Sequence, residues 1–174
     1  VYLGDPVPDF NGGINLKLNY KNFELETFMA VFLGVENYNF SKWFTDFYPS
    51  FTGAAIGTNV RNSWTPERGG NTVPIFENIS NFSNNTQSTS YYVENGNYAR
   101  LTNLQIAYNF PSSFLSRFGF EKARFYIQGT NLLTISNYSG LDPGVAGNAD
   151  TTLGIDVGNP PVTRGFNVGL NLGL

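Results

Sequence analysis

Paired carboxylates are the first residues in this sequence whose types and spacing could do chemistry. Glu24 and Glu26 lie two residues apart in a segment of alternating polarity, so they would share one face of a strand. Two carboxylates on one face could serve a hydrolase, but no His or nucleophile elbow accompanies them. The chain has no His and no Cys, which removes the usual general base, the thiolate metal sites and disulfides. We therefore expect no enzyme, no metal site and no cofactor.

Aspartates and aromatic residues of the loops are the remaining candidates. Asp142, Asp150 and Asp156 stand among glycines and prolines, but their spacing does not match a calcium-binding loop, so solvated carboxylates are expected. A short helix predicted between Ser41 and Pro49 carries several aromatic residues, which could grip a sugar or peptide or pack onto the loop's own core. As residues facing substrate or a partner protein we expect Trp43, Phe44, Phe47, Tyr48 and Asp142.

Composition limits the class of protein. The 174 residues carry a net charge of −3 with Lys and Arg scattered, so nucleic acid is not an expected partner. No apolar run approaches the roughly 18 residues of a membrane-spanning helix, yet aromatics are 16% and charges only 13%. Insertion into a membrane would therefore require β-strands that close into a barrel. The chain begins without an initiator Met or a signal peptide, and we expect a fragment of a longer protein.

Alternating polarity predicts five strands, at about 12–20, 23–33, 98–110, 123–133 and 163–174, with long loops at about 34–97 and 134–162. The last strand is the clearest, because its second face holds only Asn and Gly. Such a strand fits a membrane barrel, with its apolar face toward lipid and its small polar face toward the lumen. The predicted lipid-facing residues are Phe166, Val168, Leu170, Leu172 and Leu174.

The charges and the connections agree with a barrel. Lys17, Glu24 and Glu26 all fall opposite the apolar row of their strands, although an ordinary sandwich would sort them in the same way. A two-residue turn at Lys21-Asn22 and a short link after Pro111 alternate with long loops, as in outer-membrane barrels. The pair Asn95-Gly96 indicates either a tight hairpin or a bulge before the third strand.

The short link is itself predicted to contain one helical turn between Ser112 and Phe120, closed by Gly119. Its apolar residues would join those at the end of the preceding strand in an interfacial aromatic girdle. The residues of this girdle are Tyr108, Phe110, Phe114, Leu115, Phe118 and Phe120.

Several short motifs, in the same order along the chain, resemble the C-terminal barrel region of SusC/RagA-type TonB-dependent transporters. They cover nearly the whole sequence, which makes their joint specificity high. The motifs are Gly4-Asp5-Pro6 with Pro8-Asp9-Phe10, Trp64-Thr65-Pro66-Glu67, Tyr92-Val93-Glu94-Asn95-Gly96, Tyr98-x-Arg100-Leu101-x-Asn103-Leu104, Tyr108-Asn109-Phe110-Pro111, Gly129-Thr130-Asn131-Leu132-Leu133-Thr134, Tyr138-Ser139-Gly140-Leu141-Asp142-Pro143 and Pro160-x-x-x-Arg164-x-Phe166.

This resemblance implies an all-β fold, in which antiparallel strands form the C-terminal part of a large transmembrane barrel with long extracellular loops. Barrels of this type have about 22 strands and are plugged by an N-terminal domain. The implied function is import of an oligosaccharide or peptide across the bacterial outer membrane, with TonB, a SusD-like surface lipoprotein and outer-membrane lipid as partners. The alternative is a soluble β-sandwich carbohydrate-binding module, in which Trp43, Trp64 and Tyr91 would stack on sugar rings.

Overall fold

The computed structural model describes residues 3–46, 55–70, 73–76, 87–144 and 151–174. They form two compact units, each built from three separate stretches of the chain. The first, called here the sheet unit, comprises Asp9–Leu33, Asn97–Ser136 and Pro161–Leu174. The second, called here the polar unit, comprises the described residues of Val1–Pro8, Gly34–Gly96 and Asn137–Pro160.

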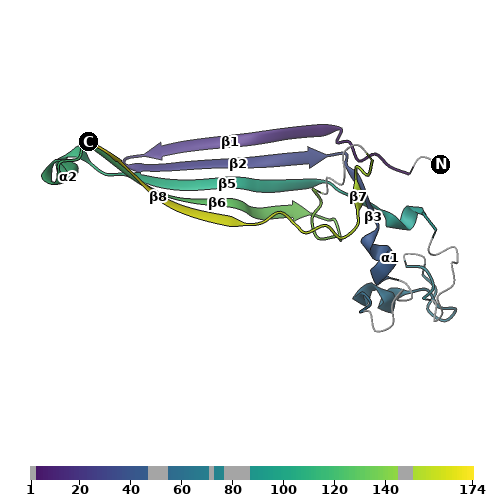
Figure 1. Cartoon of the computed structure of the whole chain (residues 1–174). Coiled ribbons are helices and arrows are strands. Elements are labelled where there is room, and N and C mark those ends of the chain that lie inside the picture. Colours follow the sequence, from purple (N-terminus) through teal and green to yellow (C-terminus); the bar gives the residue numbers. More distant parts are fainter. Residues whose placement is uncertain (1–2, 47–54, 71–72, 77–86, 145–150) are drawn as a thin grey trace. The chain divides into compact units, whose positions relative to one another are not determined.

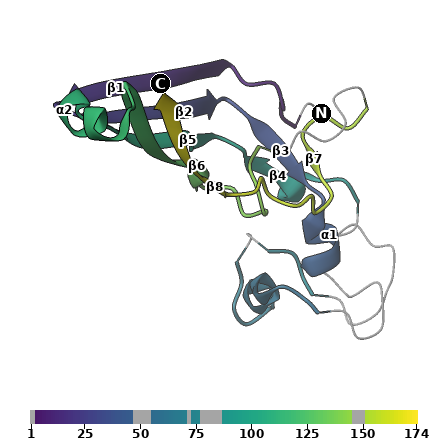
Figure 2. The same cartoon turned by 60° about the vertical axis from the view of Figure 1, so that its left-hand side comes forward.

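The sheet unit is one antiparallel sheet in the order β1-β2-β5-β6-β8 (Figures 1 and 2). Its strands are β1 (Phe10–Tyr20), β2 (Phe23–Leu33), β5 (Tyr98–Asn109), β6 (Lys122–Ser136) and β8 (Gly165–Gly173). Within this sheet, each strand pairs with the strand of the same sheet that comes next along the chain, so the sheet is a meander. Its outer strands, β1 and β8, each pair on one side only. The all-β antiparallel fold class is thereby confirmed.

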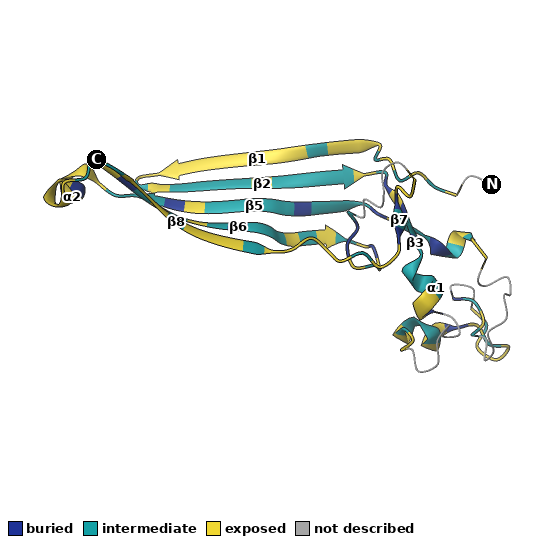
Figure 3. Cartoon of the chain, viewed as in Figure 1, coloured by how far each residue is buried: buried dark blue, intermediate teal, exposed yellow. Residues whose placement is uncertain are grey.

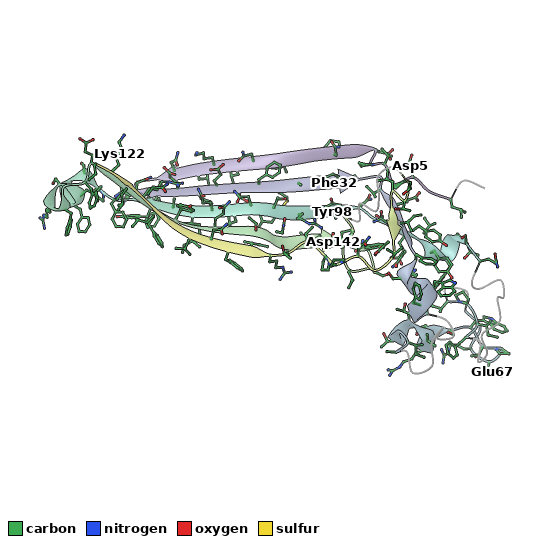
Figure 4. The ribbon with its side chains drawn as sticks, in the orientation of Figure 1. Asp5, Phe32, Glu67, Tyr98, Lys122 and Asp142 are labelled. Atoms are coloured by element: carbon green, nitrogen blue, oxygen red, sulfur yellow. The ribbon has the colours of Figure 1, made fainter. Side chains whose placement is uncertain are left out.

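Two of the strands extend further than the alternation of the sequence predicts. β1 begins at Phe10, two residues before the predicted start at about 12, and runs through Gly12 and Gly13. Gly13 lies beneath the ring of Phe28, where a Cβ atom would stand 2.6 Å from the ring carbons. β6 continues to Ser136 because its partner β5 continues to pair with it as far as Tyr98. The ring of Tyr98 stacks there on that of Phe32, and both residues are labelled in Figure 4.

The strand pairing is irregular at neighbouring positions of the three middle strands, β2, β5 and β6. The β2–β5 register shifts between Phe28 and Met29, and the β5–β6 register shifts between Leu101 and Asn103. On β6 the matching residue is Asn131, which has a positive φ of 52° and donates from its side chain to the Thr163 carbonyl. Bulges of this kind bend strands and increase their twist, as curved sheets require.

The connections at the two ends of the sheet differ in length. β1 and β2 are joined by Lys21-Asn22, and β5 and β6 by a link holding helices α2 (Ser112–Leu115) and η4 (Ser116–Phe118), with Gly119 at a φ of 79°. Both short links lie at one end, here called the hairpin end, because the strands run antiparallel. The helical turn predicted over 112–120 is therefore present. The opposite ends of the strands connect to the stretches of the polar unit.

The polar unit contains a three-stranded sheet in the order β4-β3-β7. β3 (Glu36–Asn39) pairs with β4 (Val93–Asn95) antiparallel and with β7 (Ile155–Asp156) parallel. The described residues of this unit also form helices α1 (Ser41–Thr45), η1 (Thr58–Asn62) and η3 (Ser90–Tyr92). Asn95-Gly96 forms neither a hairpin between neighbouring strands nor a bulge in β5, since Asn95 is the last residue of β4 and the chain leads from Gly96 to a strand of the other sheet.

Candidate functional site

The five-stranded sheet has one face without a charged residue, here called the apolar face. The registers place Leu18, Leu25, Ile106, Ile127 and Val168 in one row across all five strands. Comparable rows above and below contain Phe, Leu, Ile, Val, Met and Tyr, with Thr27, Ala and Gly as the other residue types. Many of these side chains are exposed, up to 74% for Phe166. Figure 3 shows that β1 is exposed along most of its length.

The predicted residues of the last strand lie on this face. Phe166, Val168, Leu170 and Leu172 alternate with Gly and Asn, and the first three pair with apolar-face positions of β6. Leu174 follows the strand and is 90% exposed. A large exposed apolar area of this kind marks a surface that meets something other than water.

The other face, here called the polar face, collects the charged residues of the five strands. Glu24 accepts hydrogen bonds from Arg124 at 3.0 Å and from Asn109 at 2.8 Å, so three neighbouring strands meet at one carboxylate. Lys17 and Glu26 form a looser pair at 3.8 Å. Glu24 and Glu26, considered above as a catalytic pair, thus each face a cation. Their arrangement is that of cross-strand ion pairs rather than of an acid and base around a substrate.

Amides, hydroxyls and aromatic rings fill the rest of the polar face. Gln128 donates to the side chain of Asn103 at 2.7 Å, and the Arg100 guanidinium donates to Thr134 at 3.0 Å. Tyr126 lies across Gly169 of the neighbouring strand, where a Cβ atom would stand 2.3 Å from its ring. The Asn and Gly residues of β8 therefore accommodate the larger polar side chains of β6. This face suits a water-filled lumen.

The polar unit is organised around buried hydrogen-bonding side chains. Asp46 is 5% exposed and accepts hydrogen bonds from the Tyr91 hydroxyl at 2.5 Å and from Asn59 at 3.1 Å. Burial and the adjacent Asp46 carboxylate raise the pKa of Tyr91, so this hydroxyl stays protonated and remains a donor. The contact joins helix α1, helix η1 and helix η3.

A second cluster of the polar unit surrounds Glu94 of β4. Lys42 lies 2.6 Å from its carboxylate and also donates to the Tyr91 carbonyl. Ser139 donates to the same carboxylate from its backbone at 2.9 Å and from its hydroxyl at 2.7 Å. Burial raises the pKa of Glu94, but the hydrogen bonds from Lys42 and Ser139 outweigh it, so the pKa lies below its usual value.

A third contact fixes the stretch before Pro160. The Tyr138 hydroxyl donates to Asp156 at 2.8 Å, and the Asn37 side chain donates to the Pro143 carbonyl at 2.8 Å. Asn37 and Asp156 are each 1% exposed. Burial and the Asp156 carboxylate raise the pKa of Tyr138, which keeps its proton at neutral pH. The two long connections are therefore held together by side-chain polar bonds as much as by strand pairing.

The residues predicted to face substrate have different environments. Trp43 and Phe44 are neighbours on α1, with ring centroids 4.8 Å apart, and Phe40 stacks on Trp43 at 5.9 Å. Phe44 is 41% exposed. Phe47 and Tyr48 lie outside the described residues. Asp142, labelled in Figure 4, is 8% exposed and accepts the backbone N–H of Gly144 at 2.8 Å, which gives it a turn-forming role. That these residues face a substrate or partner stays a prediction.

A shallow cleft of about 160 Å³ opens in the polar unit. It is lined mainly by apolar side chains of three chain stretches, with Glu36 as its carboxylate. Sequence reasoning missed this cleft, because its walls come from segments that were assigned to irregular loops. Its lining residues are Leu3, Gly4, Pro6, Glu36, Tyr38, Val93, Leu153 and Gly154.

In the described ranges, no helix is long and apolar enough to span a membrane. Within the same ranges, no three His, Cys, Asp or Glu side chains are grouped so that they could hold a metal ion.

Comparison with known proteins gives close matches over nearly the whole chain. The TonB-dependent receptor P3 of Formosa agariphila is 37% identical over 180 residues, which cover 98% of this chain and 17% of that protein. The TonB-dependent receptor P26 of the same organism is 33% identical and covers 99% of this chain and 18% of that protein. No family model matches the sequence. The chain thus spans about a fifth or less of the length of these relatives.

Solved structures show the same fold. The RagAB peptide importer in its open-open state aligns over 98% of this chain and 18% of that chain, with a TM-score of 0.77 and 23% identity. Its closed-closed state aligns over 97% with a TM-score of 0.76 and 24% identity. The two-faced antiparallel sheet is therefore part of an outer-membrane β-barrel.

Together the sequence matches and the fold define the family. The chain belongs to the TonB-dependent receptors, proteins of the bacterial outer membrane, and it shares its fold with the SusC/RagA-type importer RagAB. The relatives are named as receptors and importers rather than as enzymes. The sandwich alternative is wrong, because these matches assign the sheet to a barrel wall instead of to one half of a sandwich.

Proposed function

We propose that this chain supplies a wall segment and outer loops of a TonB-dependent importer that takes up a peptide or an oligosaccharide across the outer membrane. The observation that carries the proposal is the distribution of charge. The charged residues of the five neighbouring strands of the sheet all lie on one face. A Lys or Arg on the lipid side of a barrel costs roughly 2–4 kcal/mol at the bilayer midplane. The apolar face would then contact outer-membrane lipid, and the polar face would line the lumen.

The lengths of the connections orient the segment. Outer-membrane barrels place short turns on the periplasmic side and long loops outside. The hairpin end would accordingly be periplasmic, and the long connections that build the polar unit would begin and end at the extracellular side. Exposed aromatic residues of the polar unit, such as Phe44 and Trp64, are suited to contact a substrate or a surface lipoprotein.

An importer of this kind is expected to have two protein partners and no catalytic activity of its own. Importers of this kind would work with a SusD-like surface lipoprotein and would draw energy from TonB through other parts of the full-length protein. The relationship to the peptide importer RagAB supports such an assembly. We further propose that the chain itself catalyses no reaction, because Glu24 and Glu26 are occupied by cross-strand partners.

The test uses the full-length protein in its native host. Outer membranes are fractionated, the protein is examined by gel mobility with and without boiling, and co-purifying lipoproteins are identified. Uptake of fluorescent peptides and of fluorescent oligosaccharides is then compared between the parent strain and a deletion strain. The proposal expects heat-modifiable migration, an associated lipoprotein and loss of uptake for one substrate class. Unchanged uptake of both classes, or recovery in the soluble fraction, would overturn it.

Loop variants refine the same experiment. Trp43→Ala with Phe44→Ala should lower uptake by several fold while leaving outer-membrane levels unchanged. Leu141→Ala is the matched control, since Leu141 is an exposed apolar residue of the same unit at 65% exposure. Equal effects of the two changes would remove the α1 aromatics from the proposed contact surface.

A further inference from the structure

The shallow cleft of the polar unit is built along one edge of β3. The backbone N–H of Glu36 donates to the Asp5 carbonyl at 2.9 Å, and that of Tyr38 donates to the Gly154 carbonyl at 2.8 Å. The stretch that contains Asp5, labelled in Figure 4, and the stretch before β7 therefore lie along the same edge. Because residues two apart in a strand point to the same face, Glu36 and Tyr38 both line the cleft.

Close contacts fix the walls of the cleft. Gly154 has a φ of 74°, and a Cβ atom there would stand 2.2 Å from the Cβ of Pro6, so only glycine lets these two stretches meet. The Tyr38 ring stacks on the buried ring of Tyr92 at 5.3 Å between centroids. Its hydroxyl donates to the Ser88 hydroxyl at 3.2 Å. The cleft is thus a formed feature of the polar unit.

The lining combines aliphatic walls with one carboxylate. The Oε2 atom of Glu36 accepts the backbone N–H of Asp5 at 3.2 Å. Among the residues that the structure describes, Glu36 forms no ion pair with a Lys or Arg. A carboxylate in such a position attracts a positive charge from a binding partner. The aliphatic side chains of the lining are Leu3, Pro6, Val93 and Leu153.

A Lys or Arg side chain matches this lining, because it carries a charged end on an aliphatic stem. An oligosaccharide offers hydroxyl groups but neither an aliphatic stem nor a positive charge. We propose that the cleft is a subsite for one Lys or Arg side chain of an imported peptide. The stem lies between Pro6 and Leu153, and the cation meets the carboxylate of Glu36. The inference rests on the proposed function and deepens it, since it names basic peptides as the substrate class.

The test measures the binding of fluorescent alanine peptides to the full-length transporter, purified in detergent without its lipoprotein. One peptide carries a central lysine, and the other carries norleucine, which keeps the aliphatic stem but lacks the charge. The parent protein should bind the lysine peptide about threefold more tightly, as expected for an exposed ion pair. Raising the salt concentration should reduce this preference. Equal binding of the two peptides, or binding of neither, would overturn the inference.

Variants of the lining separate the charge from the stem. Glu36→Gln should abolish the preference for lysine, whereas Glu67→Gln should preserve it. Glu67, labelled in Figure 4, is the matched control, because it is an exposed carboxylate of the same unit outside the cleft lining. Leu153→Ala should weaken the binding of both peptides equally, because it removes contact with the stem. A preference for lysine that survives Glu36→Gln would overturn the inference.

Photo-cross-linking identifies the occupant in outer membranes. A benzophenone amino acid replaces Leu153, and the lysine peptide is supplied in the medium before illumination. An adduct with the peptide supports the subsite. An adduct with the surface lipoprotein, or with another segment of the same protein, would assign the cleft to that occupant and overturn the inference.

The subsite and the importer can fail separately. Uptake of fluorescent oligosaccharides without binding of the lysine peptide would overturn the subsite while supporting the importer. Unchanged uptake of both substrate classes in the deletion strain would overturn the importer, and the subsite with it.

Discussion

The two units of this chain differ in which side chains they expose and which polar side chains they bury. In the sheet unit, large apolar residues are exposed on one face, and ion pairs form on the other. Among the described residues of the polar unit, six polar residues are at least nine-tenths buried, namely Asn37, Asn39, Asp46, Ser63, Asp142 and Asp156. The difference follows from the surroundings that each unit requires. The exposed apolar face of the sheet needs an apolar medium to cover it, whereas the polar unit holds its loops together through internal hydrogen bonds.

The largest effect on this comparison is expected from Lys42→Ala in the polar unit. Its ammonium lies 2.6 Å from the Glu94 carboxylate, and both side chains are mostly buried. Removing one partner of a buried pair leaves an uncompensated charge and costs about 3–5 kcal/mol. Hydrogen exchange of the full-length protein should therefore become faster in Val93–Asn95 and near Ser139, with the five strands unaffected. Protection unchanged in both segments would show that the pair does not hold the loops together.

A medium effect is expected from Gly169→Val in the sheet unit. The new side chain would collide with the ring of Tyr126 on the polar face. Overpacking of this kind costs about 1–3 kcal/mol. The temperature at which the heat-modifiable gel band converts should fall, and Tyr126→Ala in the same protein should restore it. A fall that persists without the Tyr126 ring would point to the backbone of β8 instead.

A smaller effect is expected from acid, and it should be confined to the polar unit. The pKa of Glu94 is lowered by its hydrogen bonds, so the contribution of this group is present above the unfolded pKa of about 4.3. It is lost as the pH falls through the still lower pKa of the folded state. Hydrogen exchange near Val93–Asn95 should accelerate at such pH values. Glu94→Gln should remove much of this pH dependence, and an unaltered dependence would assign it to other carboxylates.

The smallest effect is expected from Lys17→Gln. The pair of Lys17 with Glu26 is long at 3.8 Å and its side chains are 59% and 38% exposed. Exposed pairs contribute about 0–1 kcal/mol. The conversion temperature on gels should therefore change little, in contrast to Arg124→Gln, which removes a shorter contact to Glu24. A large shift for Lys17→Gln would mean that the pair is shielded in the complete barrel.

The wall could be predicted from the sequence because period-two alternation is a local signal. β8 shows the signal most clearly, with Phe166, Val168 and Leu170 separated by Asn and Gly. The ends of strands were harder to predict, since Gly12 and Gly13 are typical of turns but here lie under rings of neighbouring residues. The side of β1 and β2 on which charges fall could be predicted, but the partners of Glu24 could not, because Asn109 and Arg124 are remote in sequence.

The polar unit was largely hidden from sequence analysis. β3 contains Glu36-Asn37-Tyr38-Asn39, whose buried positions are two asparagines, so no hydrophobic pattern marks the strand. Its core depends on contacts such as Tyr91 with Asp46, between residues 45 positions apart. The candidate loop residues were selected by type alone, and this could not distinguish the exposed Phe44 from the buried, turn-forming Asp142. The contacts of Tyr91 with Asp46 and of Lys42 with Glu94 could be found only through the three-dimensional structure.

The measurement that tests the central claim most directly compares Val168→Arg with Asn167→Arg in the full-length protein. The two residues are adjacent on β8, and Val168 lies in the row of Ile127 on the apolar face while Asn167 pairs with Gln128 on the polar face. Arginine on the lipid side near the midplane costs roughly 2–4 kcal/mol, so Val168→Arg should reduce the amount of heat-modifiable protein in the outer membrane. Asn167→Arg should leave it near the parent level. Equal outer-membrane amounts for the two variants would contradict the assignment of one face to lipid and the other to the lumen.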